Sequence, residues 1–98
     1  MRCLSWNCQG LGRPRTVCAL KEIIRVKSPQ ILGIIETKKR DKDFNRLKYG
    51  LGFQNCFAVS SCGKARGLAV LWDDSIDLRV IGYSQRHIDV VVKDHQEV

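Results

Sequence analysis

Two short stretches of the sequence each contain, where an apolar run ends, a side chain that can hold a phosphate or a metal ion. Residues 4–12, LSWNCQGLG, place Asn7 where an apolar run meets a glycine-bracketed turn, and residues 30–36, QILGIIE, end in Glu36. Asparagine is disfavoured inside strands, and its amide needs partners when it is buried. Asn7 therefore either shapes the turn or presents its amide to a ligand.

The chain between these stretches predicts the element that joins them. Residues 14–27 carry apolar residues at helical spacing, Pro14 suits a first helical turn, and Ser28-Pro29 ends the pattern. Residues 2–7 and 30–36 are predicted strands, the second of them buried on both faces. A β-α-β unit makes its two strands parallel, so Asn7 and Glu36 are expected at one carboxyl edge, where ligands bind in open α/β sheets.

The rest of the chain changes character. The stretch after Glu36 predicts a basic helix that ends near Gly50 and Gly52. Four β-rich segments follow, separated by turn residues, at residues 55–61, 67–72, 76–82 and 87–93. Short strands at this spacing predict hairpins and antiparallel pairing. The expected fold class is α+β: a β-α-β unit followed by antiparallel hairpins.

One carboxylate beside one amide is a sparse site of hard oxygen ligands. Mg²⁺ suits such a site, because it keeps several waters and takes only one or two protein carboxylates. On this hypothesis Glu36 binds the ion, and Asn7 holds a phosphate oxygen or an ion-bound water. The alternative is structural: Asn7 caps its own turn, and Glu36 pairs with a nearby lysine or arginine. Both interpretations are open at this point.

The net charge of +7 is concentrated in one half of the chain. Residues 1–48 hold 12 Lys and Arg against 4 Asp and Glu, a net +8, whereas residues 49–98 hold 5 against 6, a net −1. A basic half suits a polyanion such as nucleic acid, although a solvated helix face gives the same pattern. Lys64 and Arg66, in a glycine-containing loop, are candidate phosphate contacts; the alternative is a solvated loop.

Cysteine usage and hydropathy narrow the class of protein. The five cysteines form no C-x-x-C pair, which argues against a disulfide framework and favours a reducing compartment. No run of apolar residues approaches the roughly 18 residues that a membrane span needs. We expect an intracellular protein with no membrane association, and the basic cluster Lys38-Lys39-Arg40 suggests a nuclear one.

Three stretches in order, LSWNCQGLG, ILGIIETK and CGKARGLAVLWDDS, carry a family resemblance. The chain resembles the opening of the endonuclease/exonuclease/phosphatase family, with the DNase I-like fold, and is most similar to endonuclease domains of plant LINE-type (non-LTR) retrotransposons. The resemblance implies a four-layer α/β sandwich and hydrolysis of a phosphodiester in DNA. It also implies that Glu36 ligates the catalytic Mg²⁺, or Mn²⁺ in its place, and that Asn7 orients the metal and the scissile phosphate.

The family also uses a downstream Tyr, a Gly-Asp-x-Asn motif and a terminal Ser-Asp-His motif, none of which stands here in its proper place. Residues 1–98 are therefore expected to be a partial domain whose C-terminal half is missing, inactive alone, with that half and the DNA backbone as partners. The alternative is a non-catalytic basic nucleic-acid-binding module. A third hypothesis is a non-functional relic, and a phosphatase branch is not excluded.

Two short sequences imitate the absent motifs. Asp43-Phe44-Asn45 has Lys42 in place of the glycine and lies in the basic helical stretch, so it is predicted to be a solvated helix face. Asp94-His95 has Lys93 in place of the serine and is predicted to be a turn. His87, on a predicted strand, is expected at the surface. None of the three is assigned a catalytic role.

Overall fold

The computed structural model describes residues 2–7, 14–37, 44–60, 67–84 and 86–93. Two helices and six strands follow one another along these residues. Their order is β1 (Cys3–Asn7), α1 (Pro14–Lys27), β2 (Ile31–Ile35), α2 (Phe44–Gly50), β3 (Asn55–Val59), β4 (Leu68–Trp72), β5 (Asp77–Tyr83) and β6 (Ile88–Lys93). The predicted α+β class is confirmed, and α1 and the end of α2 lie where the sequence placed them.

The strands form two separate sheets. The larger sheet has the order β1-β2-β4-β3, in which β1 and β2 are parallel and β4 is antiparallel to both β2 and β3. The smaller sheet is the antiparallel β5–β6 hairpin, with a register irregularity between Val80 and Gly82. The predicted β-α-β unit and the predicted hairpins are therefore both present, and the mixed sheet is consistent with part of a DNase I-like fold.

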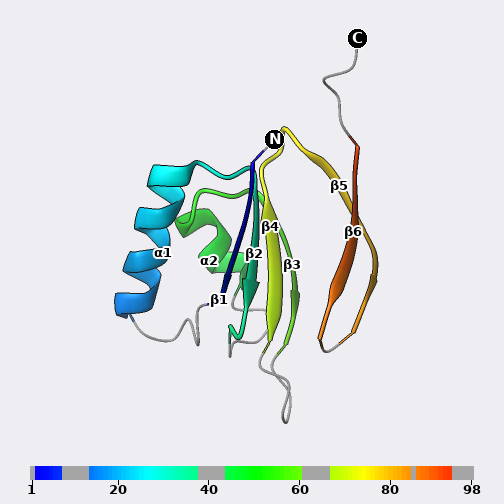
Figure 1. Ribbon diagram of the computed structural model, residues 1–98, viewed down its shortest axis with the longest axis horizontal. Coiled ribbons are helices and arrows are strands. Elements are labelled where there is room, and N and C mark those ends of the chain that lie inside the picture. The colour runs from blue at the N-terminus through cyan, green and yellow to red at the C-terminus, as the bar shows by residue number, and fades with distance from the viewer. Residues whose placement is uncertain (1, 8–13, 38–43, 61–66, 85, 94–98) are drawn as a thin grey trace.

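The described elements stack in three layers, with the larger sheet in the middle (Figure 1). Helices α1 and α2 cover one face, and the β5–β6 hairpin lies against the other. Strand β2 contributes side chains to the cores on both faces of the sheet, because side chains alternate along a strand. Leu32 and Ile34 pack with Leu20 in the helix-side core, whereas Ile31 packs with Val70 in the hairpin-side core.

The crossover helix ends as its sequence predicts. Ser28 adopts a left-handed backbone with φ 47°, and its N–H donates to the carbonyl of Ile24 at 2.8 Å. Pro29 follows and is buried. A left-handed residue after the last turn, followed by proline, is a usual way to stop a helix. The stop turns the chain directly into β2.

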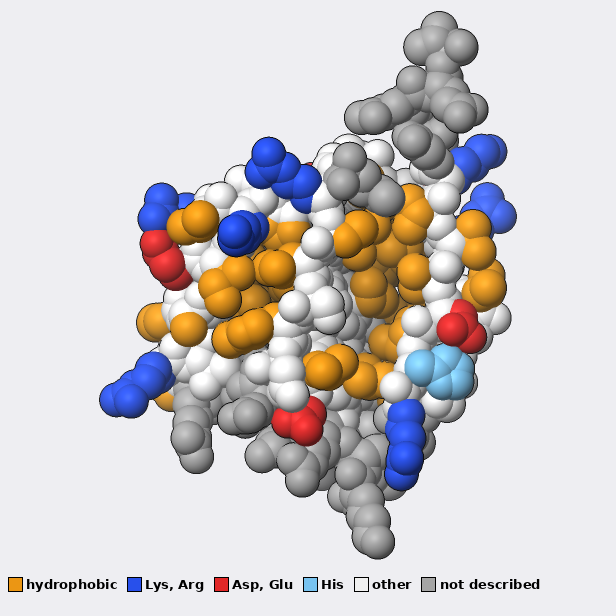
Figure 2. Space-filling view, viewed as in Figure 1, with side chains coloured by type: hydrophobic (Ala, Val, Ile, Leu, Met, Phe, Trp, Pro, Cys, Tyr) orange, Lys and Arg blue, Asp and Glu red, His pale blue; other side chains and the backbone are white. Residues whose placement is uncertain are grey.

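The hairpin leaves part of the sheet face open. Strand β6 contacts β4, and between the sheet and the hairpin lies a groove of about 220 Å³. Figure 2 shows hydrophobic side chains lining this hollow. Ile35 is 41% exposed beside the groove, so the prediction that the second strand is buried on both faces is wrong at its last residue. Ile35 lines the groove together with Ile88 and Val90 of the hairpin, so the hairpin does not close over this residue.

Candidate functional site

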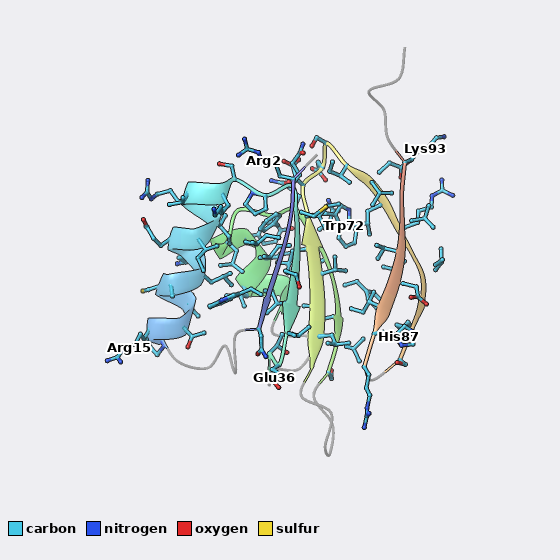
Figure 3. All side chains as sticks on the ribbon, viewed as in Figure 1. Arg2, Arg15, Glu36, Trp72, His87 and Lys93 are labelled. Atoms are coloured by element: carbon cyan, nitrogen blue, oxygen red, sulfur yellow. The ribbon has the colours of Figure 1, made fainter. Side chains whose placement is uncertain are left out.

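Asn7 and Glu36 lie at the same edge of the larger sheet. In the parallel pairing of β1 with β2, Asn7 is opposite Ile35, and Glu36 is the next residue along. Paired residues on adjacent strands are about 5 Å apart, so the backbones of Asn7 and Glu36 are close neighbours at this edge. Figure 3 shows Glu36 at this end of the sheet. The structure thus brings both residues to the predicted edge, while their chemical roles stay a prediction.

The backbone of Glu36 is in an unusual conformation. Its φ of 57° is in the left-handed region, which non-glycine residues rarely enter. Such a conformation costs roughly 1–2 kcal/mol and persists only where the surroundings impose it. Strained residues of this kind cluster at functional sites, although Ser28 has a similar φ at the end of α1, where it stops the helix.

A contact between Thr37 and Gly67 lies directly beside that conformation. The N–H of Thr37 donates a hydrogen bond to the carbonyl oxygen of Gly67 at 3.3 Å. Thr37 is completely buried, and no buried side-chain nitrogen or oxygen among the described residues lacks a hydrogen-bond partner. Gly67 itself has φ 89° and begins the approach to β4. The backbone directly after Glu36 is therefore tied to the segment that precedes β4.

Sequence reasoning missed this latch between Thr37 and Gly67. Its signal was present but weak: a small polar residue directly after Glu36, and a glycine directly before the apolar run of β4. Neither residue type points to the other without the β2–β4 pairing. The antiparallel register, in which Ile35 is opposite Leu68, is what brings them together.

His87 lies at the same end of the molecule as Glu36, on the β5–β6 hairpin (Figure 3). Its Nδ1 is 2.7 Å from the Ser84 hydroxyl oxygen, and its Nε2 is 3.4 Å from a carboxylate oxygen of Asp89. The side chains of His87 and Asp89 are 57% and 60% exposed, so water screens this pair. The arrangement orders the hairpin turn, in keeping with the surface position predicted for His87.

Several predicted residues lie outside the described part of the chain. They are the candidate phosphate contacts Lys64 and Arg66, the basic cluster Lys38-Lys39-Arg40, and the motif imitations at Asp43 and at Asp94-His95. Phe44 and Asn45 begin α2, as the helical prediction requires, and α2 packs beside β3.

A known protein family matches nearly the whole chain. Residues 4–97 match the model of the Endonuclease/Exonuclease/phosphatase family. The chain belongs to this family. No curated protein matches it. The endonuclease/exonuclease/phosphatase family indicates a domain of the nuclease or phosphodiesterase type, and its members generally depend on a divalent metal.

The described residues of this family member fit a sparse metal site. They contain no group of three or more His, Cys, Asp or Glu side chains that would hold an ion by themselves. Mg²⁺ does not require one, because it keeps waters and shares its remaining positions with substrate phosphates. One carboxylate and one amide at the same edge of the sheet are compatible with that chemistry. None of the helices in the described residues is long and apolar enough to cross a membrane.

Proposed function

We propose that this chain is the metal-binding part of a Mg²⁺-dependent DNA endonuclease, with Glu36 as the metal ligand and Asn7 as the phosphate ligand. The observation that supports this most is the left-handed backbone of Glu36 at the carboxyl edge, one position beyond the residue that pairs with Asn7. Strained backbone conformations cluster at functional sites, and this one falls on a residue that the family motif singles out.

Each residue has a distinct task in this proposal. The Asn7 side-chain amide, exposed at the end of β1, donates an N–H to a non-bridging oxygen of the scissile phosphate and so fixes its orientation. Glu36 contributes the carboxylate that Mg²⁺, or Mn²⁺, requires. When bound there, the ion would supply charge stabilisation for the leaving oxygen. The latch between Thr37 and Gly67 keeps that carboxylate positioned before substrate arrives.

The proposal includes an origin and a partner. The similarity of residues 62–75 to plant LINE-type endonuclease domains supports descent from a retrotransposon, with target DNA in the nucleus as the substrate. The Gly-Asp-x-Asn and Ser-Asp-His motifs, which would carry the water-activating base, do not occur in these 98 residues. We therefore propose that the base comes from a C-terminal half, and that these residues alone do not cleave DNA.

The test supplies that half from a related complete domain, fused or co-expressed, and measures nicking of supercoiled plasmid in Mg²⁺. Complementation is expected to restore nicking, Glu36→Ala to abolish it, and Asn7→Ala to reduce it by about 10²–10³-fold. Asp43→Ala is the matched carboxylate control and is expected to change little. Loss of nicking at Asp43 with none at Glu36 would place the metal ligand elsewhere.

The second candidate function is a non-catalytic nucleic-acid-binding module. The net +8 of residues 1–48 favours it independently of the site. Such a module binds DNA through phosphates with little sequence preference, and its affinity falls steeply as salt rises. Filter binding with and without Mg²⁺ separates the two: the module binds equally in both, keeps its affinity in Glu36→Ala, and fails to nick even when complemented.

A further inference from the structure

The groove between the larger sheet and the β5–β6 hairpin lies beside an open strand edge. Strand β6 pairs with β5 on one side, and no described strand pairs with it on the other. Tyr83 of β5 contacts Phe57 of β3, with ring centroids 5.1 Å apart, so β5 lies over β3. From the two hairpin strands, the groove is lined by Ile88 and Val90, both of β6. The unpaired edge of β6 therefore faces the groove.

The two layers on either side of the groove differ in width. Four strands form the larger sheet, whereas two form the hairpin layer. Ile31, at the start of β2, is buried in the hairpin-side core, but Ile35 at the end of β2 is 41% exposed. Ser5 of β1 is exposed as well, and both Ser5 and Ile35 line the groove. A strand that paired with β6 would lie about 5 Å from it and would cover this open part of the sheet.

The floor of the groove leaves room for a side chain from such a strand. Gly33 of β2 is paired with Ser5 of β1, and both residues line the groove. A Cβ built on Gly33 would have its nearest atoms, in Leu4 and Ser5, at 3.9 and 4.0 Å. The groove volume of about 220 Å³ exceeds the roughly 150 Å³ of an apolar cavity that binds benzene. A leucine or an aromatic side chain can therefore be accommodated above Gly33.

The chemistry of the groove suits the inner face of a β-strand. Figure 2 shows mainly hydrophobic side chains in the hollow. Strand β6 reads IDVVVK, without a proline, so its open edge presents an uninterrupted row of backbone donors and acceptors. A row of backbone groups beside apolar pockets is the arrangement that binds an added strand, because the main chain pairs while alternate side chains enter the pockets.

We propose that a β-strand of the C-terminal half pairs with the open edge of β6 and fills the groove above Gly33. This inference rests on the proposed function, which requires that half. Figure 3 shows His87, which precedes β6, at the same end as Glu36, and Lys93, which ends β6, at the other. A strand antiparallel to β6 therefore runs towards Glu36, and antiparallel pairing is the more stable per residue. The groove thus binds the half and directs the residue after this strand to the metal-binding edge.

A second copy of this chain is disfavoured in the groove by its own larger sheet. Two β6 strands in an antiparallel pair are related by a two-fold axis perpendicular to the sheet, so the larger sheets of both copies would lie on the same side. Each larger sheet extends beneath its groove, where it contributes Ser5, Gly33 and Ile35. The two sheets would then occupy the same space. A strand from a different half does not carry this sheet and meets no such obstacle.

The test measures binding of the C-terminal half of a related complete domain, expressed separately and fluorescently labelled, to this chain. Fluorescence anisotropy is recorded in EDTA and without DNA, so that the affinity depends on neither metal nor substrate. Val90→Lys places a charge in the groove, and Gly33→Leu fills the space above the sheet. Each substitution is expected to weaken binding by about 30-fold, as at a central position of an interface.

The controls make the same changes away from the groove. Val26→Lys alters a valine that is 59% exposed on α1, on the face of the larger sheet opposite the hairpin. Gly50→Leu alters a glycine at the end of α2 that also has open space around it. Both should change the affinity by less than about twofold. Thermal melts of the isolated variants check folding. Val90 is 36% exposed, so a lysine there can extend to water and the chain is expected to stay folded.

Hydrogen exchange gives a separate measure of edge pairing. Every second backbone N–H of β6 is expected to exchange more slowly once the half is bound, because alternate residues of a strand direct their N–H groups to the same side. Unchanged exchange along β6, or equal losses of affinity in Val90→Lys and Val26→Lys, overturns the proposal. So does a wild-type chain that does not bind the half, or self-association that Val90→Lys abolishes and the half does not displace.

Failure of this inference and failure of the proposed function give different results. If Glu36→Ala abolishes nicking in the complemented protein while Val90→Lys and Gly33→Leu bind the half normally, the endonuclease function stands and the strand docking is refuted. If both groove variants weaken binding of the half but complementation never restores nicking, the docking stands and the endonuclease function fails.

Discussion

The N–H of Thr37 is 3.3 Å from the carbonyl oxygen of Gly67 and donates a hydrogen bond to it. This contact ties the segment after β2 to the segment before β4, and Glu36 lies immediately inside it with a left-handed backbone. The site is thus shaped by main-chain geometry as well as by the side chains that it presents.

The strain at Glu36 predicts a difference between two substitutions. Glu36→Gly is expected to be more stable than Glu36→Ala by about 1 kcal/mol, because glycine adopts positive φ without a Cβ clash. At Ile35, which is in β2, the same pair of substitutions should give the opposite order. Urea unfolding of the four variants measures the free energy of unfolding. Equal stability of Glu36→Gly and Glu36→Ala would mean that the left-handed backbone is not imposed.

The buried hydroxyl of Thr37 predicts the cost of removing it. Thr37→Val keeps the shape of the side chain but leaves a buried hydrogen-bonding group without its partner, at a cost of about 1–3 kcal/mol. Thr37→Ser keeps the hydroxyl and loses only a methyl group, about 0.8 kcal/mol. Chemical denaturation ranks the two. A valine variant as stable as the wild type would show that the latch depends on the backbone alone.

Two glycines are expected to respond to alanine in opposite directions. A Cβ at Gly33 would project beside the open groove, with its nearest neighbours 3.9 and 4.0 Å away, so Gly33→Ala should stabilise by about 0.5–1 kcal/mol. Gly52 also has open space around it, but its φ is 87°, so Gly52→Ala should destabilise by about 1 kcal/mol. If Gly33→Ala and Gly52→Ala changed the melting temperature in the same direction, these two explanations would be contradicted.

Burial raises the pKa of the Cys56 thiol above its ordinary value, with Lys48 lowering it in part. The folded state therefore retains this proton to higher pH than the unfolded state does, and the stability from this group is lost as pH rises through the alkaline range. Cys56 should react with iodoacetamide more slowly near neutral pH than the exposed Cys3 and Cys18 do. Mass spectrometry of the alkylated peptides gives the order, and fastest labelling at Cys56 would contradict it.

Local patterns in the sequence were sufficient for most elements. The helical spacing before Ser28-Pro29 predicted α1 at residues 14–27, and the β-α-β rule predicted that Asn7 and Glu36 share one edge of the sheet. The exposure of Ile35 was not predictable in this way. It depends on where the β5–β6 hairpin lies across the sheet, and that is set by packing between segments far apart in the sequence.

In the candidate site, too, local sequence patterns predicted one part, and packing between distant segments sets the rest. Residue types identified Asn7 and Glu36, because an amide and a carboxylate at strand ends suggest ligands. The left-handed backbone of Glu36 and the contact between Thr37 and Gly67 arise only when β4 is laid against β2. The chain between Thr37 and Gly67 includes residues 38–43, for which the sequence predicts helix, whereas the described α2 begins at Phe44.

The strand order β1-β2-β4-β3 has a consequence for how the chain reaches its fold. Strand β4 lies between β2 and β3, and it pairs Ile31 with Trp72 across a long stretch of chain. The β1-α1-β2 unit and the β3–β4 hairpin can each form from nearby residues, whereas their union must close that long loop. Docking of the two units is therefore expected to be the slow event. The strained conformation of Glu36 would arise at that event, making it a marker for completion of the sheet in refolding experiments.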